Sequence, residues 1–356
     1  MACENTSEFT DDLSAKTLYN HNKEKRKGIA NMKKFFSLLL ALIMVLGLTA
    51  CGQPDSDAST DGSPQKYDLI AAAGNSGSAG NSLVSAMCQI IQTQLSDVTM
   101  TPNETNTGAC PEAIQTDMCQ AGVTTTANMA DAMAGTGDYS QVCDKPMQML
   151  YLYEMPMHIF LRADDNISSM EDLKGQPVGS LVAGSFATVV MDKLLPYYGM
   201  SWDDFSQVNT GTGSETISML KNRQIKMTFA ANTPPHNLAL DLESATTMAL
   251  MDLPEDIISQ FCEDYPAYTE YVIPAGTYED VSQDIHTISA PYIFCVSSDI
   301  PEEIVYEMTK AICENSSSLG DVLAVLKDAT PEYLGTQTNV PMHPGAEKYF
   351  KEIGVL

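Results

Sequence analysis

Short apolar segments alternate with amphipathic segments along most of this chain. The first apolar run, residues 67–73, predicts a strand, and a glycine-rich turn at 74–80 separates it from a predicted helix. The apolar positions of that helix are Leu83, Met87, Ile90, Ile91 and Leu95. A strand, a glycine-rich turn and a helix N-terminus direct several backbone N–H groups at one point.

The same sequence of elements recurs along the chain. Further strands are predicted at 98–100, 177–181 and 225–231. Helices are predicted through Ile114 and Met118, and with Val190 and Leu194 on an apolar face. This alternation predicts an α/β fold with largely parallel sheets covered by helices on both faces. Ligands of such folds bind at the carboxyl ends of the strands.

Two extended apolar segments, 155–161 and 287–296, suit strands that cross between two lobes. After the second, Pro301 and the acidic residues that follow it are typical of a helix start. We therefore predict that residues 67–161 and 287–356 form lobe 1, and that residues 162–286 form lobe 2.

The N-terminal region carries a secretion pattern. A basic pair at Lys33 and Lys34 precedes the apolar run 35–48, and Ala50 stands directly before Cys51. The run is shorter than the roughly 20 residues that span a bilayer. A cysteine in this position resembles the bacterial lipobox. We expect residues 32–50 to be a signal peptide and Cys51 to be lipidated, which places the protein outside the cytoplasmic membrane.

The segments on either side of this signal are polar. Residues 1–31 lack apolar periodicity, and we expect translation to begin at Met32, with 1–31 a mis-called extension. Residues 51–66 are rich in Ser, Asp, Gly and Pro, and we expect a flexible tether between lipid and lobes.

The chain is strongly acidic, with a formal net charge of −27. Residues up to Lys34 hold 7 basic and 5 acidic residues, so the remainder holds 19 − 7 = 12 basic and 46 − 5 = 41 acidic residues, a net charge of −29. This balance argues against nucleic acid and against an anionic membrane surface as partners, because both need basic patches. We expect membrane contact only through the lipid.

Beyond Cys3 and Cys51 the chain has seven cysteines, an odd number without a CxxC pair. Cys88, Cys295 and Cys313 lie in apolar helical or strand patterns and are expected to be buried thiols. Cys110, Cys119 and Cys143 are close in sequence and either include one disulfide or remain free.

No pattern of nucleophile, base and acid supports catalysis, and no cluster has metal-ligand spacing. We expect no enzyme activity, no cofactor and no metal. His158 lies in an apolar strand and is interpreted as a core residue. Arg162 and Arg223 are the only arginines after the signal, and both are interpreted as structural or solvated. The alternative of an enzyme on the same scaffold requires a reactive Cys or Ser and a base in the cleft.

Several blocks carry a family resemblance, mostly in the C-terminal third. They are residues 271–278, 299–306, 343–350, 162–164 with 172–175, and the turn 74–80. In these blocks the chain resembles the TAXI subgroup of solute-binding proteins of tripartite ATP-independent periplasmic (TRAP) transporters. The resemblance implies a two-lobed type II periplasmic-binding fold, a monomer, and delivery of a small polar solute to an ion-coupled permease. A receptor for an ATP-driven importer is the alternative.

The turns predict the ligand site. The residues expected to contact the solute are Asn75, Ser76, Ser78, Asn81, Thr107, Ser185, Phe186 and Asn232. Residues 79–82 and 184–187 depart from the family pattern, which usually has Thr and Tyr in the first turn and Gly-Ser-Gly-Thr in the second. Phe186 either covers an apolar part of the solute or packs within its lobe.

The chemistry of the solute is predicted from the same turns. We expect a carboxylate or an amino acid, because helix N-termini that converge on one site favour negative charge. The shortage of arginine and the acidic field oppose this preference.

Overall fold

The computed structural model describes residues 66–74, 76 and 78–356. The predicted signal peptide, the lipidation of Cys51, the tether up to residue 65 and Asn75 therefore lie outside the described residues. Among the helices that the structure describes, none combines the length and apolar character needed to cross a membrane.

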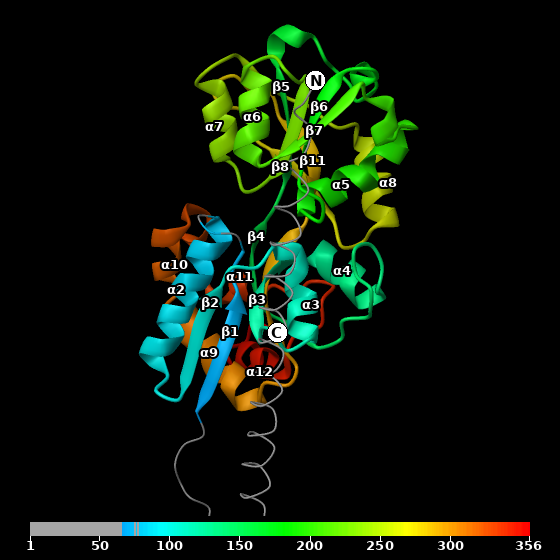
Figure 1. Cartoon of the computed structure of the whole chain (residues 1–356). Coiled ribbons are helices and arrows are strands. Elements are labelled where there is room, and N and C mark those ends of the chain that lie inside the picture. The colour runs from blue at the N-terminus through cyan, green and yellow to red at the C-terminus, as the bar shows by residue number, and fades with distance from the viewer. Residues whose placement is uncertain (1–65, 75, 77) are drawn as a thin grey trace, which may run out of the picture. The chain divides into compact units, whose positions relative to one another are not determined.

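The first sheet has five strands in the order β2-β1-β3-β12-β4 (Figure 1). Their bounds are β1 (Tyr67–Ala72), β2 (Val98–Asn103), β3 (Ala121–Thr125), β4 (Pro146–Glu154) and β12 (Pro291–Ser297). The pairs β1–β2 and β1–β3 are parallel, whereas β12 runs antiparallel to both β3 and β4.

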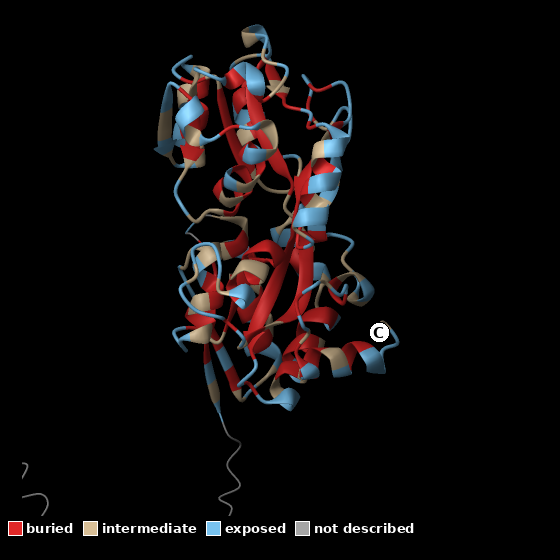
Figure 2. Cartoon of the chain, turned by 90° about the vertical axis from the view of Figure 1, so that its right-hand side faces the viewer, coloured by how far each residue is buried: buried red, intermediate tan, exposed pale blue. Residues whose placement is uncertain are grey.

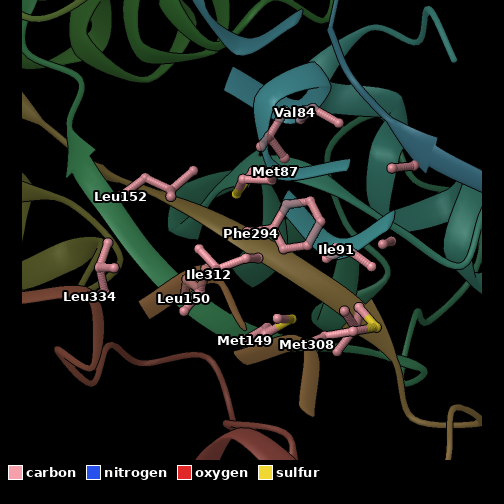
Figure 3. Close-up of a cluster of buried hydrophobic side chains, with 14 of the residues drawn as sticks. Val84, Met87, Ile91, Met149, Leu150, Leu152, Phe294, Met308, Ile312 and Leu334 are labelled. Carbon is pink, nitrogen blue, oxygen red and sulfur yellow. The ribbon is translucent and has the colours of Figure 1, made fainter. Parts of the chain in front are cut away.

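Helices cover both faces of this sheet and enclose two apolar clusters. The larger cluster lies under α2, α9 and α12, and Phe294 of β12 points into it beside Met87 and Ile91 of α2 (Figure 3). The smaller cluster lies under α3 and α4 on the other face. The helix bounds are α2 (Ala79–Gln94), α3 (Cys110–Gln115), α4 (Thr126–Ala134), α9 (Glu302–Glu314), α10 (Ser317–Val322), α11 (Pro331–Leu334) and α12 (Pro344–Glu352).

The second sheet repeats this arrangement in the order β7-β6-β8-β5-β9. Its strands are β5 (Met157–Arg162), β6 (Pro177–Leu181), β7 (Gln207–Gly211), β8 (Met227–Ala231) and β9 (Met248–Leu250). The helices are α5 (Phe186–Leu194), α6 (Gly213–Lys221), α7 (Asn237–Glu243) and α8 (Glu255–Asp264). A hairpin of β10 (Thr269–Ile273) and β11 (Ile285–Ser289) is antiparallel. The strands of both lobes are largely buried, while the helices expose their outer faces (Figure 2).

Short 3-10 turns complete the fold. They are η1 (Thr107–Ala109), η2 (Ala163–Asp165), η3 (Glu171–Leu173), η4 (Leu195–Tyr198), η5 (Trp202–Asp204) and η6 (Ala324–Leu326).

The prediction of largely parallel sheets is wrong for half of each sheet. In each, two strand pairings are parallel and two are antiparallel. The antiparallel pairings all involve β12 or β5, the strands that the chain reaches directly from the other lobe. Because no helical crossover precedes them, nothing returns the chain to the parallel direction.

The chain passes between the sheets at residues 155–156 and again at Ala290. The predicted boundary after residue 161 places β5 in lobe 1, whereas β5 pairs with β8 and β9 of the second sheet. All six residues of β5 are buried, and a continuous apolar run does not reveal which sheet it joins.

One predicted helix is shorter than expected, and the predicted buried cysteines are present. The helix predicted through Ile114 and Met118 ends at Gln115; Asp117 has φ +60°, and Met118 is exposed. The buried thiols of Cys88, Cys295 and Cys313 are confirmed. Cys110, Cys119 and Cys143 are free thiols as well, so the structure contains no disulfide among the described residues.

Candidate functional site

A cavity of about 390 Å³ lies between the two lobes. Lobe 1 lines it with the segments around η1 and α4, and lobe 2 lines it with the β6–α5 turn and α5. The lining residues are Asn106, Gly108, Ala109, Glu112, Asn128, Asp131, Gly137, Asp138 and Tyr139 from lobe 1, with Ala183, Gly184, Val189, Asp192 and Lys193 from lobe 2. The volume falls within the range of small-molecule sites.

The wall from lobe 1 is fixed by local hydrogen bonds. The Asn106 side chain caps η1 by accepting from the backbone N–H of Gly108 at 2.9 Å, and the Tyr139 hydroxyl donates to the Gly108 carbonyl at 2.6 Å. Burial raises the pKa of Tyr139, so the hydroxyl remains a donor at neutral pH.

The two lobes meet at a pair of glycines. A Cβ atom on Gly108 would lie 2.6 Å from the carbonyl oxygen of Gly184 in the other lobe. Gly184 has φ +74°, a left-handed conformation that glycine adopts without strain. The missing side chains therefore let the two turns approach across the cavity.

The wall from lobe 2 begins at the N-terminus of α5. Ser185 is the N-cap, and its hydroxyl accepts from the N–H of Thr188 at 3.4 Å and shares a hydrogen bond with the Thr188 hydroxyl at 2.8 Å. This capping directs the helix N-terminus toward the turn that carries Gly184.

An ion pair joins the lobes at the far wall. Lys193 Nζ of α5 lies 3.0 and 2.7 Å from the carboxylate oxygens of Asp131 in α4. The same ammonium lies 4.9 Å from the ring centroid of Tyr265 and 5.4 Å from that of Tyr268. A second contact between the lobes runs from the Thr126 hydroxyl to the Ala267 carbonyl, at 2.8 Å.

The cavity lining is acidic. It contains the carboxylates of Glu112, Asp131, Asp138 and Asp192, and its single cation is Lys193. Asp131 pairs with that lysine, and Asp192 accepts a hydrogen bond from the Trp202 indole at 2.6 Å. The side chains of Glu112 and Asp138 form no hydrogen bond or ion pair within the described part of the chain.

Asn128 contributes a buried polar group to the same cavity. The residue is 4% exposed, and its backbone N–H donates to the Thr125 hydroxyl at 3.1 Å, which fixes the first turn of α4. Its side-chain nitrogen Nδ2 has no hydrogen-bond partner among the described residues. Leaving a buried amide unsatisfied costs free energy, so a partner at this position would be stabilising.

Residues 70–354 match the NMT1-like family. The chain belongs to the NMT1-like family.

The solved structures that are similar to this NMT1-like protein include two periplasmic-type folds. One is PhnD1 from Prochlorococcus marinus (MIT 9301) in complex with methylphosphonate, with 11% identity, a TM-score of 0.52, and coverage of 83% of this chain and 100% of that chain. The other is a TctC solute binding protein from Polaromonas, with 15% identity, a TM-score of 0.50, and coverage of 82% and 99%. The predicted fold class, a two-lobed α/β periplasmic-binding fold of type II, is confirmed.

The predicted ligand residues of lobe 1 lie in the turns that follow β1 and β2. Ser76 is exposed, and Ser78 is the N-cap of α2, accepting from the N–H of Asn81 at 3.1 Å. Thr107 begins η1 between the cavity-lining residues Asn106 and Gly108. These residues sit at strand ends as expected, but none of them lines the cavity.

None of the predicted residues of lobe 2 lines the cavity. Ser185 follows Gly184 directly. Phe186 is 5% exposed and stacks on Tyr268 with a centroid distance of 6.1 Å. Of the two roles expected for it, the side chain therefore has the one of packing within its lobe. The Asn232 side chain accepts from the N–H of Thr233 at 2.9 Å, directly after β8.

Sequence reasoning missed the residues of α4, the following loop and the last turn of α5. Asp131 and Lys193 are 62 residues apart and each reads as an ordinary charge on a helix surface. The nearest signal was the polar, glycine-containing loop at 135–140, which holds Gly137, Asp138 and Tyr139.

The arginines and His158 are structural, as expected. Arg162 is 1% exposed and is held by Asp164, Asp165 and the carbonyls of Leu220 and Ile225. Arg223 is exposed and pairs with Asp164. His158 Nε2 lies 2.8 Å from the Tyr278 hydroxyl in the interior of lobe 2. No group of His, Cys, Asp and Glu with metal-binding geometry occurs in the part that the structure describes.

Proposed function

We propose that this NMT1-like protein is an extracytoplasmic receptor that encloses a small polar solute between its lobes and delivers it to a membrane transporter. The observation that carries this proposal is the cavity lined from both lobes, together with the ion pair of Asp131 and Lys193 across it. A solute held from both sides has its highest affinity for the closed arrangement. Its binding free energy therefore shifts the protein toward that form.

The resemblance to TAXI-type proteins supports a TRAP permease as the transporter. A receptor for an ATP-driven importer is the alternative, since the fold serves both. Neighbouring genes for the fused membrane subunits of a TRAP permease support the first, and genes for a nucleotide-binding subunit support the second. The protein acts as a monomer in this proposal and needs no cofactor.

Lipidation of Cys51 would keep such a receptor at the membrane. The Cys51→Ser variant should then be released from the membrane fraction or should accumulate as an uncleaved precursor. Unchanged processing and unchanged membrane association would refute the anchor while leaving solute binding open.

The close approach of Gly108 to Gly184 provides the test of solute capture. The natural solute is identified by mass spectrometry after denaturation of the purified protein, and its affinity is then measured by calorimetry. Gly108→Ala should weaken binding at least roughly tenfold, because the new methyl group would meet the Gly184 carbonyl when the lobes close. Its free energy of unfolding should change by less than about 1 kcal/mol, since the clash is between lobes rather than within a core.

A matched control is Ala134→Ser, which adds one atom at an exposed position in lobe 1 outside the cavity. It should bind the solute as the parent does. Equal affinity of the parent and the Gly108→Ala variant would contradict capture between these two turns.

A further inference from the structure

We infer that the cavity between the lobes selects a solute that carries a protonated amine together with a hydrogen-bond acceptor, over the same solute without the amine. This inference rests on the proposed function and names the chemical class of its ligand.

The first step is the balance of charge in the cavity. Lys193 is the single cation in the lining, and Asp131 already neutralises it at 2.7 Å. Asp192 is occupied by the Trp202 indole. Glu112, which is half-buried, and Asp138, which is exposed, remain as carboxylates without an ion pair or hydrogen bond to a described residue. A cation brought by the solute would pair with one of these carboxylates, whereas an anionic solute would add repulsion.

The second step is the position of the Asp138 carboxylate. A Cβ atom on Gly184 would lie 3.3 Å from Asp138 Oδ2, so this oxygen from lobe 1 stands beside the turn of lobe 2. An ammonium group bound there would touch both lobes and would be held only in the closed arrangement.

The third step is the buried amide of Asn128. Its Nδ2 donor is unpartnered although the residue is 4% exposed and lines the cavity. A carbonyl or carboxylate oxygen of the solute would satisfy it, and the N-terminus of the nine-residue helix α5 borders the same space. The acceptor group of the solute would therefore lie toward Asn128.

The fourth step excludes a solute that is only an anion. Neither arginine of the described chain reaches the cavity, because Arg162 is buried among acids of lobe 2 and Arg223 pairs with Asp164. A carboxylate without an amine would bring no counter-charge for Glu112 or Asp138.

The experiment uses the full chain and matched probes at pH 7, measured by calorimetry. The pairs are γ-aminobutyrate against butyrate and norleucine against hexanoate, and the members of each pair differ by one amine. The amine-bearing member should bind roughly tenfold to a hundredfold more tightly, as expected for a charged hydrogen-bonded partner. Glu112→Gln and Asp138→Asn should each reduce that preference about tenfold, and Asn128→Ala should weaken both members of a pair. Glu307→Gln, an exposed acid of α9 in the same lobe, is the matched control and should preserve the preference.

Equal or tighter binding of butyrate or hexanoate overturns the inference, as does a preference that survives the combined Glu112→Gln and Asp138→Asn variant. If no probe binds, the molecule released on denaturing the purified protein decides the question. A released molecule with a basic nitrogen supports the inference. One without a basic nitrogen overturns it and leaves the receptor function intact. Failure of the protein to bind or release any solute overturns both.

Discussion

The two lobes share one strand order but bury different polar groups. In both, the strand that is second in the sheet order, β1 or β6, leads through a turn with a left-handed glycine, Gly74 or Gly184, to a helix capped by a serine, Ser78 or Ser185. The strand that arrives from the other lobe ends differently in each. In lobe 2, β5 ends at the buried Arg162, whereas in lobe 1 the equivalent strand β12 ends at Ser297.

The residue at this strand end is set by the side chains around it and not by the sheet itself. The Ser297 hydroxyl accepts from the N–H of Asp299 at 3.2 Å, a local bond that needs no charge. Arg162 instead compensates Asp165, whose side chain is 4% exposed and also contacts Lys226. The last position of this strand holds either a serine or an arginine. The guanidinium of Arg162 therefore compensates the acidic side chains around it and is not needed to form the sheet.

The largest effect expected from this comparison is that of Arg162→Met. The substitution leaves Asp165 buried with only Lys226 as a cation and removes the donors to two backbone carbonyls. The free energy of unfolding, measured with urea, should fall by about 3–5 kcal/mol, as for a buried ion pair that loses one partner.

Arg223→Met is the control, because that arginine is exposed and its ion pair with Asp164 should contribute less than about 1 kcal/mol. A similar loss for both variants would show that burial does not distinguish the two arginines.

The next effect is the response of lobe 2 to acid. Burial lowers the pKa of His158 to about 3, with a smaller contribution from His236, and burial lowers the pKa of His236 to about 4. In the unfolded chain each of these histidines has a pKa near 6.5. Between pH 6.5 and the lowered pKa of the folded state, the unfolded chain therefore binds more protons than the folded one. Stability is therefore complete above about pH 6.5 and falls as the pH drops, by about 2 kcal/mol per histidine at pH 5.

The contribution of one histidine can be isolated with His158→Gln, whose amide oxygen can still accept from the Tyr278 hydroxyl. Urea unfolding at pH 7 and pH 5 should show a smaller acid-induced loss in this variant. An unchanged loss would place the acid sensitivity elsewhere, for example at His343 of lobe 1, whose pKa burial also lowers.

The smallest effect separates the two equivalent serine caps. Ser78→Ala and Ser185→Ala should each cost about 1 kcal/mol of stability, because each removes the acceptor for an N–H of the first helical turn. Only Ser185→Ala should also weaken solute binding, by a few-fold, since it loosens the turn that carries the cavity-lining Gly184. Thermal unfolding and calorimetry test both; equal binding losses would mean that the two caps do not differ.

The sequence predicted the elements of this fold better than its pairings. The strands β1, β2, β6 and β8 and the helices α2, α5 and α9 follow from short-range apolar periodicity, which local burial enforces. The direction and sheet of β5 depend on partners that only the tertiary structure provides.

The predicted ligand residues differ from the residues that line the cavity. Ser78 and Ser185 stand at the expected strand ends, yet their hydroxyls cap helices, a local use that competes with ligand contact. The cavity depends on Asp131, Asp138 and Lys193, whose encounter is set by how the lobes pack and has no local sequence signal.

The ion pair between Asp131 and Lys193 also bears on how faithfully cargo is reported to a transporter. Every contact that the lobes make without solute raises the share of empty receptors in the closed form, and a transporter that reads closure would accept some of them as loaded. With side chains 18% and 19% exposed, this pair is only partly shielded from salt. For the receptor proposed above, lower ionic strength would therefore strengthen this contact and increase the share of empty molecules that a transporter accepts as loaded.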